Sequence, residues 1–232
     1  MKINLFKDAK IKKGCTIIEG FPGFGLVGPI ATEFLTEHLK TRLVGEFVYH
    51  DLPATTAIHN GKVVRPMGLH YDEKRNILIF HTILSVKSKE WVAAEEVIRI
   101  ASEFKAKEII SLEGVNAMVP GIESRVFSFG NPGLEKLGAE QIQESIIMGV
   151  TAALLLKTTN TSCLFAETQS GLPDSKAAAA IIGMLDKYLS LAVDIAPLQK
   201  QAQEFEQKLK TILAQTQKTM DEADRKNLSY LG

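Results

Sequence analysis

The chain has little cysteine and no long apolar run. Its two cysteines, Cys15 and Cys163, lie far apart and lack the CxxC spacing that gathers thiolates around zinc or forms a redox pair. The segment 1–14 is charged throughout and lacks the apolar core of a signal peptide. No stretch reaches the roughly 18 uninterrupted apolar residues of a membrane helix. We therefore expect a cytoplasmic protein with no membrane partner, in which each cysteine is a small buried hydrophobe.

The chain also lacks an excess of either charge. Its 27 basic and 27 acidic residues give a formal net charge of zero. Sequence-independent nucleic-acid binding needs a broad positive field, so we expect no nucleic-acid partner. A low net charge also weakens repulsion between copies, which favours association with itself or with another protein.

No histidine or serine pattern indicates a catalytic or metal site. Ser111 and Ser170 lack the GxSxG context of a nucleophile elbow. Glu113 and Glu167 follow or end predicted strands, where α/β sheets usually bind ligands, and they are the best remaining catalytic candidates. The histidines show none of the HxxxH or HExxH spacings that present two ligands on one helix face: His38, His50, His59, His70 and His81.

Short β-type runs alternate with longer helical runs along most of the chain. This alternation predicts an α/β fold with a mostly parallel sheet covered by helices on both faces. Asn60-Gly61 predicts a tight hairpin within an antiparallel region, because a type I′ turn needs positive φ at both positions. We expect strands at 15–20, 43–49, 55–59, 62–71, 76–83, 108–112, 125–129 and 162–166, and helices at 26–39, 91–104, 142–156 and 176–189, the last with Asp174 as its N-cap.

Composition divides the chain into three parts. We expect an α/β core domain at 1–196, a C-terminal helical segment at 197–226 and a flexible tail at 227–232. The helical segment could pair with a neighbouring copy as a short coiled coil, or fold back on its own sheet. Its narrow apolar seam has steps of four and three: Leu198, Ala202, Phe205, Leu209 and Ile212.

A glycine-rich turn follows the first buried strand. Residues 23–28 satisfy GxGxxG between a predicted strand and a predicted helix, which is the context of a dinucleotide-binding fingerprint. In that interpretation the backbone N–H groups bind an anion, and Asp51 meets a ribose hydroxyl. Alternatively, the turn is purely structural, which two prolines and two phenylalanines favour because they crowd the backbone donors. The turn contains Gly20, Phe21, Pro22, Gly23, Phe24, Gly25 and Gly28, and no GK[ST] follows, which excludes a P-loop.

The residues of this turn, GFPGFGLVG at 20–28 followed by IATEFL at 30–35, resemble the opening signature of the proteasome assembly chaperone 2 family. Further matches are NGKVVRP at 60–66, ISLEG at 110–114 and PDSKAA at 173–178, so the resemblance covers about residues 14–213. It implies an α/β/α sandwich related to nucleoside phosphorylases. It also implies a homo-oligomer that assists or activates the proteasome without ATP, with no cofactor and no catalysis.

The resemblance also directs attention to the C-terminus. Family members that engage the proteasome often end in a hydrophobic residue, a tyrosine and one last residue, which insert between α-subunits. This chain ends with Leu228, Ser229, Tyr230, Leu231 and Gly232, so its tyrosine comes one position early and follows a serine. We expect a non-catalytic assembly chaperone or activator whose Leu228, Tyr230, Leu231 and Gly232 dock on proteasome α-subunits. The alternative is a nucleotide- or nucleoside-binding enzyme that uses the glycine-rich turn.

Overall fold

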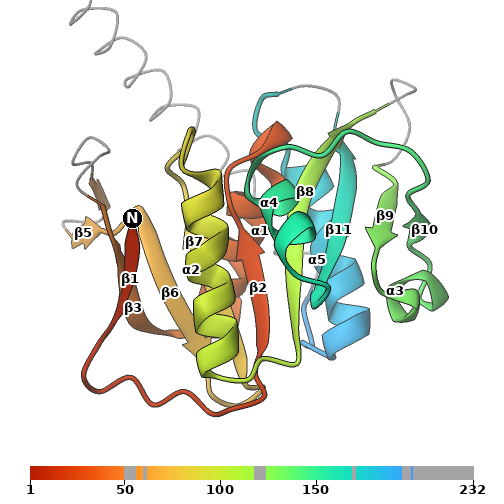
Figure 1. The fold of residues 1–232 in the computed structure, drawn as a ribbon. Coiled ribbons are helices and arrows are strands. Elements are labelled where there is room, and N and C mark those ends of the chain that lie inside the picture. Colours follow the sequence, from red (N-terminus) through yellow and green to blue (C-terminus); the bar gives the residue numbers. More distant parts are fainter. Residues whose placement is uncertain (50–55, 60–61, 118–123, 169–170, 195–199, 201–232) are drawn as a thin grey trace, which may run out of the picture.

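A computed structural model describes residues 1–232 apart from 50–55, 60–61, 118–123, 169–170, 195–199 and 201–232. Its centre is a nine-stranded sheet with helices on both faces (Figure 1). The strand order is β1-β3-β6-β7-β2-β8-β11-β9-β10, and β4 and β5 form a separate two-stranded sheet. The predicted α/β fold with helices on both faces is therefore confirmed.

The four central strands run parallel. They are β7 (Ile77–Thr82), β2 (Thr16–Gly20), β8 (Glu108–Asn116) and β11 (Thr161–Thr168). Every residue of β2, β7 and β11 is buried, as expected for parallel strands covered on both faces. Because the four strands are parallel, their carboxyl ends meet at one edge of the sheet, which we call the carboxyl edge.

The flanks of the sheet are mainly antiparallel. On one side β6 (Met67–Asp72), β3 (Arg42–Val48) and β1 (Lys2–Leu5) follow β7 in antiparallel pairings. On the other side β9 (Val126–Phe129) pairs antiparallel with β11, and β10 (Glu140–Gln141) pairs parallel with β9.

The predicted antiparallel hairpin is confirmed in its strands. β4 (Ala57–His59) pairs antiparallel with β5 (Lys62–Val64), whereas Asn60 and Gly61 themselves lie outside the described residues. The predicted strand 62–71 is two strands, β5 and β6, since Arg65 and Pro66 lie between them.

Each face of the sheet buries its own apolar core. Ile18 packs with α1 (Val27–His38), α3 (Pro132–Lys136) and α5 (Ser175–Leu189). Its neighbour Ile17 packs with α2 (Glu90–Glu103) and α4 (Gly149–Lys157) on the opposite face. Successive strand residues point to opposite faces, so one apolar strand contributes to both cores. Figure 1 shows α2 and α4 in front of the sheet and α5 behind it.

One helix is shorter than the sequence predicts. The expected helix 142–156 starts only at Gly149, which has a φ of +80°, and it ends at Lys157. The side chains of Ile146 and Met148 are 89% and 76% exposed, so the apolar pattern that suggested a longer helix reflects surface residues. By contrast, the predicted N-cap is confirmed, because Asp174 Oδ1 accepts the N–H groups of Lys176 and Ala177 at 3.1 and 3.0 Å.

Part of the predicted organisation cannot be compared with the structure. The helical segment 197–226, apart from Lys200, and the tail 227–232 lie outside the described residues, so the division into three parts stays a prediction. The expected likeness to nucleoside phosphorylases also stays a prediction. None of the helices within the described ranges is long and apolar enough to cross a membrane.

Candidate functional site

The glycine-rich turn leaves β2 at the carboxyl edge of the sheet and enters α1 through a short 3-10 helix, η1 (Phe24–Leu26). A Cβ on Gly28 would lie 2.7 Å from the carbonyl oxygen of Leu112 and 2.9 Å from the Cα of Gly20. Real Cβ atoms do not approach so closely, so glycine at 28 lets α1 pack directly on β2 and β8.

Glu113 lies directly beneath the turn. A Cβ on Gly23 would overlap the carboxylate of Glu113. The Oε1 atom of Glu113 accepts the N–H groups of Phe24 at 3.2 Å and Gly114 at 3.1 Å, and its Oε2 atom accepts the hydroxyl of Thr151 at 3.3 Å. An N–H group that a bound phosphate would need is thus already bonded to a carboxylate of the protein itself.

A second carboxylate, that of the buried Glu19, lies on the adjacent strand β2. Its Oε1 accepts the hydroxyl of Ser111, and its Oε2 accepts the N–H of Phe21 at 3.1 Å. The Ser111 hydroxyl also contacts the hydroxyl of Thr151 at 2.8 Å. Glu19 and Ser111 are 1% and 0% exposed, whereas Glu113, directly beneath the turn, is partly exposed.

Burial controls the protonation of both carboxylates. Removal from water, together with the nearby charge of Glu19, raises the pKa of Glu113 to about 8, although its hydrogen bonds from Gly114, Thr151 and Phe24 lower it. Burial likewise raises the pKa of Glu19 to about 7, despite its hydrogen bonds from Ser111 and Phe21. Raised pKa values of this kind occur at acid–base sites. In this protein, however, both carboxylate oxygens of Glu113 already accept hydrogen bonds from the protein itself.

The aromatic residues of the turn face different environments. Phe21 is buried, and its ring meets that of Phe47 edge-on with centroids 6.1 Å apart. Phe24 is 37% exposed, and its ring lies beside Gly171, where a Cβ would meet it at 3.6 Å. Pro22 is partly buried between them in the chain, and Gly25 is buried beside Thr168 at the end of β11.

Glu167, the other catalytic candidate, pairs with an arginine of the segment before β9. Its carboxylate accepts hydrogen bonds from the Nη2 and Nε groups of Arg125 at 2.6 and 3.1 Å, which is the fork geometry of a strong ion pair. Arg125 is therefore a charged partner of Glu167, whereas among the described residues the carboxylate of Glu113 accepts only from backbone N–H groups and Thr151. Asp51, the proposed ribose partner, and the tail residues Leu228, Tyr230, Leu231 and Gly232 lie outside the described residues.

The sequence interpretation missed Glu19 and Thr151 and rejected Ser111 as a nucleophile without assigning it a role. The available signal was a charged residue inside the apolar strand 15–20. A glutamate there is rarely buried without a specific polar environment.

Histidines form another contact group near the carboxyl end of β7. His81 Nε2 lies 3.0 Å from Glu33 Oε2, and its Nδ1 lies 2.9 Å from the hydroxyl of Thr32. Burial, together with His81, lowers the pKa of nearby His70 to about 4. Within the part of the chain that the structure describes, no group of three or more His, Cys, Asp or Glu side chains could hold a metal ion.

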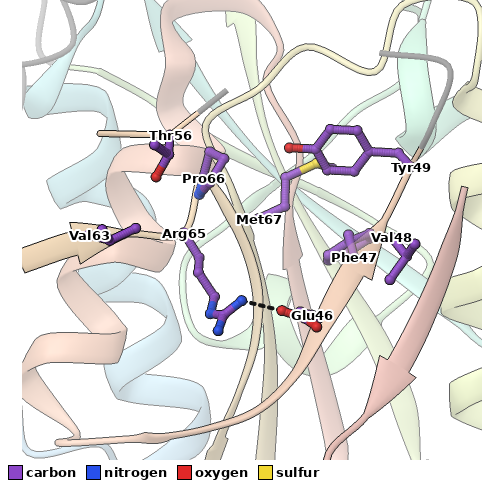
Figure 2. Close-up of a pocket in the computed structure, with 9 residues that line it drawn as sticks. All are labelled: Glu46, Phe47, Val48, Tyr49, Thr56, Val63, Arg65, Pro66 and Met67. Carbon is purple, nitrogen blue, oxygen red and sulfur yellow. Dashed lines mark hydrogen bonds and ion pairs between the residues drawn. The ribbon is translucent and has the colours of Figure 1, made fainter. Parts of the chain in front are cut away.

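A pocket of about 480 Å³ lies where β3 ends and β6 begins (Figure 2). Phe47 and Met67 supply buried apolar walls, and the exposed Val63 of β5 lines another part. Arg65 points toward Glu46 and forms an ion pair with it (Figure 2). The lining residues include none of the turn or the Glu19–Glu113 cluster, so the pocket and the predicted site are distinct.

Comparisons with known proteins identify relatives along most of the chain. The model of the PAC2 family matches residues 17–213. PbaA of Pyrococcus furiosus, an archaeal homolog of proteasome-assembly chaperone, is 28% identical, with a TM-score of 0.82 and coverage of 94% of this chain and 99% of PbaA. PbaB of the same organism, an archaeal proteasome activator, is 24% identical, with a TM-score of 0.70 and coverage of 91% and 98%. At that identity the likeness to PbaB shows the fold alone.

A curated relative supports the same assignment. The uncharacterized protein MJ0106 of Methanocaldococcus jannaschii is 30% identical over 223 residues, which cover 93% of this chain and 92% of the relative. The family match includes the turn at 20–28, Glu113 and α5. The resemblance seen in the residues of the turn is therefore confirmed, and the chain belongs to the PAC2 family.

Proposed function

We propose that this protein is a non-catalytic, homo-oligomeric proteasome assembly chaperone or ATP-independent proteasome activator that binds proteasome α-subunits. The observation that carries the proposal is the likeness to PbaA, which extends over 94% of this chain at 28% identity. A likeness over nearly the whole chain supports a shared function better than a shared motif does, because function resides in sites and not in folds alone.

The buried carboxylates support this proposal over nucleotide binding. A phosphate at the turn would have to displace Glu113 from the N–H of Phe24 and would lie close to two acidic side chains. Like charges in a buried site repel strongly. A thermal-shift screen of nucleotides and nucleosides tests the alternative. Ligand at 100 times its dissociation constant would add about 2.7 kcal/mol of stability, so a clear shift would favour the enzyme.

The tail is the proposed contact with the proteasome. An aromatic anchor followed by a terminal carboxylate can supply much of the binding energy of a small interface. In this chain Tyr230 would be that anchor, with Leu228 and Leu231 as apolar neighbours and the carboxylate of Gly232 as the charged group.

Binding of the full chain to 20S proteasome tests the proposal directly, by pull-down and by the rate of peptide hydrolysis. We expect Tyr230→Ala and removal of residues 227–232 to weaken binding at least about fivefold, as loss of more than 1 kcal/mol at an anchor implies. The matched control is Ser229→Ala, which alters the same tail without touching a proposed contact.

A second variant keeps the test decisive if the native tail is a poor match. Ser229→Leu with Gly232 removed places a hydrophobic residue before Tyr230 and a single residue after it. If neither the full chain nor this variant binds α-subunits or changes peptide hydrolysis, the proposed function is wrong.

A further inference from the structure

Four side chains beneath the turn, three of them buried and Glu113 partly exposed, form a continuous line of oxygen–oxygen contacts. Ser111 contacts Glu19 at one end and Thr151 at 2.8 Å, and Thr151 contacts Glu113 at 3.3 Å at the other end. The line joins β2, β8 and α4. Three contacts therefore connect two carboxylates through two hydroxyl groups.

Counting hydrogens shows that this line needs one more proton than two ionised carboxylates allow. Ser111 and Thr151 each carry one hydroxyl hydrogen, so together they can fill two of the three contacts. If both hydrogens point to the carboxylates, the two hydroxyl oxygens face each other at 2.8 Å with no hydrogen between them. A third hydrogen on one carboxyl group fills all three contacts.

The remaining carboxylate oxygens limit where that hydrogen can be. Glu19 Oε2 already accepts the N–H of Phe21, and Glu113 Oε1 already accepts those of Phe24 and Gly114. The hydrogen must therefore be on Glu19 Oε1 or Glu113 Oε2, the two ends of the line. If it is on Glu113, the direction of donation runs from Glu113 through Thr151 and Ser111 to Glu19.

We propose that Glu19, Ser111, Thr151 and Glu113 share one proton as a hydrogen-bond chain that holds the glycine-rich turn against α4, and that release of this proton to solvent loosens the turn. Deprotonation leaves two buried negative charges in the cluster and removes the hydrogen from the contact between Ser111 and Thr151. The turn carries Phe24 at the surface, so a change in the buried chain alters the carboxyl edge.

The surroundings favour the protonated state. From β11 the thiol of Cys163 faces the cluster, and burial together with both carboxylates raises its pKa, so it stays neutral. The other facing groups are the hydroxyls of β8 and α4 and the N–H groups of the turn. No lysine or arginine of the described residues contacts Glu19 or Glu113. Since burial raises the pKa of both Glu113 and Glu19, and the charge of one opposes ionisation of the other, the pair keeps one proton at neutral pH.

The shared proton sets the sign of a pH effect on stability, whichever of the two carboxyl groups carries it. A carboxyl group with a raised pKa holds its proton in the folded state and loses it in the unfolded state, so stability falls as pH rises through the folded pKa. His70 acts in the opposite direction, because its pKa is lowered to about 4 and its effect lies below the usual histidine pKa of about 6.5. Above about pH 8 the unfolded chain loses protons from Cys15 and Cys163, whose pKa values burial raises in the folded protein, so the window from about pH 6.5 to 8 isolates the buried chain.

Denaturant unfolding of the full chain across that window is the test. The wild type should lose stability with a slope equivalent to about one proton per chain. Glu113→Gln should remove most of this slope, because its amide donates to Thr151 at every pH while its carbonyl accepts the N–H of Phe24. The matched control is Glu73→Gln, an exposed glutamate with a side chain 72% exposed, which should keep the wild-type slope.

A double variant tests the hydrogen count itself. Glu19→Gln alone also fills the three contacts: its amide donates to Ser111, Ser111 donates to Thr151, and Thr151 donates to Glu113. This single variant should therefore fold. Glu19→Gln with Glu113→Gln supplies one hydrogen too many, so the pair should be less stable than the sum of the single changes predicts. A Glu113→Gln variant with the wild-type slope, or additive single changes, overturns the proposal.

If the variants do not fold, the wild type still gives the answer. Carbon-13 NMR of glutamate carboxyl groups should show one carboxyl that titrates above pH 6.5. Over the same pH range, hydrogen exchange of the Phe24 amide should accelerate by more than the intrinsic pH dependence of amide exchange. If every glutamate carboxyl titrates below about pH 6, as ordinary glutamates do, no proton is shared and the proposal is wrong. The shared proton does not depend on proteasome binding, so the two proposals fail separately.

Discussion

Gly23 and Glu113 form the tightest contact of the turn, which makes position 23 sensitive to a single methyl group. An alanine Cβ there would overlap the carboxylate of Glu113, and this carboxylate cannot move away without losing the N–H of Phe24. We expect Gly23→Ala to lower the free energy of unfolding by about 1–3 kcal/mol, the usual cost of overpacking a buried site. Denaturant unfolding at constant pH measures it.

Gly171→Ala is the matched control, because its Cβ would meet the ring of Phe24 at 3.6 Å, an ordinary contact. We expect a change within about 0.5 kcal/mol. Gly23→Ala combined with Glu113→Ala should cost less than the sum of the two changes, because the overlap disappears with the carboxylate. Strictly additive effects would show that the two residues do not interact.

At the scale of elements, β1 illustrates how an edge strand is protected. β1 is the last strand on its side of the sheet, so part of its backbone has no neighbouring strand. The N–H of Ile3 donates to Glu96 Oε2 at 2.7 Å, and its carbonyl accepts Arg99 Nη2 at 2.9 Å. These two side chains of α2 also pair with each other at 2.9 Å, so together they occupy the backbone groups that a further strand would use.

Substitution of Glu96 tests this protection. We expect Glu96→Ala to lower stability by about 1–3 kcal/mol, because the N–H of the buried Ile3 loses its acceptor. Glu96→Gln should cost less, since an amide oxygen can still accept that hydrogen bond. The amide of Ile3 should also exchange faster in the alanine variant.

Glu95→Ala, one residue away, is the control. Glu95 is exposed and pairs with Lys157 at 2.8 Å, and exposed ion pairs contribute about 0–1 kcal/mol. Equal losses in Glu95→Ala and Glu96→Ala would contradict the assigned role.

The central elements could be predicted from sequence because local patterns define them. The strand before the turn, α1, α2 and α5 follow from apolar spacing, and Asp174 indicates the start of α5. The four-residue β1 could not be recognised, because only Ile3 of its residues is buried and its neighbour β3 comes 37 residues or more later in the chain. The helix ending at Lys157 was predicted seven residues too early at its start, since Ile146 and Met148 are apolar yet exposed.

At the scale of the whole molecule, strand order decides which residues share a site. The position of the glycine-rich turn is readable from sequence, because GxGxxG lies between a strand and a helix. The contact between Ser111 and Glu19 spans 92 residues, and it exists because β2 lies next to β8. Spacing along the chain does not reveal that adjacency, so the buried carboxylates beneath the turn could not be paired in advance.

The proposed function makes the number of tails in one assembly as important as the affinity of each tail. Several copies of the chain in one oligomer would present several C-termini to a ring of α-subunits, and the later binding events would then be intramolecular. We expect a synthetic peptide of residues 227–232 to compete for 20S proteasome about 10²–10⁴-fold more weakly than the full chain.

Competition binding with the peptide, the full chain and the same peptide carrying Tyr230→Ala measures this difference, and the solution mass of the full chain gives the number of copies. The Tyr230→Ala peptide should not compete, because it lacks the aromatic anchor. If the native peptide matched the full chain, binding would need only one tail at a time. A full chain that binds tightly as a single copy would contradict the multivalent model, since one tail cannot gain from effective concentration.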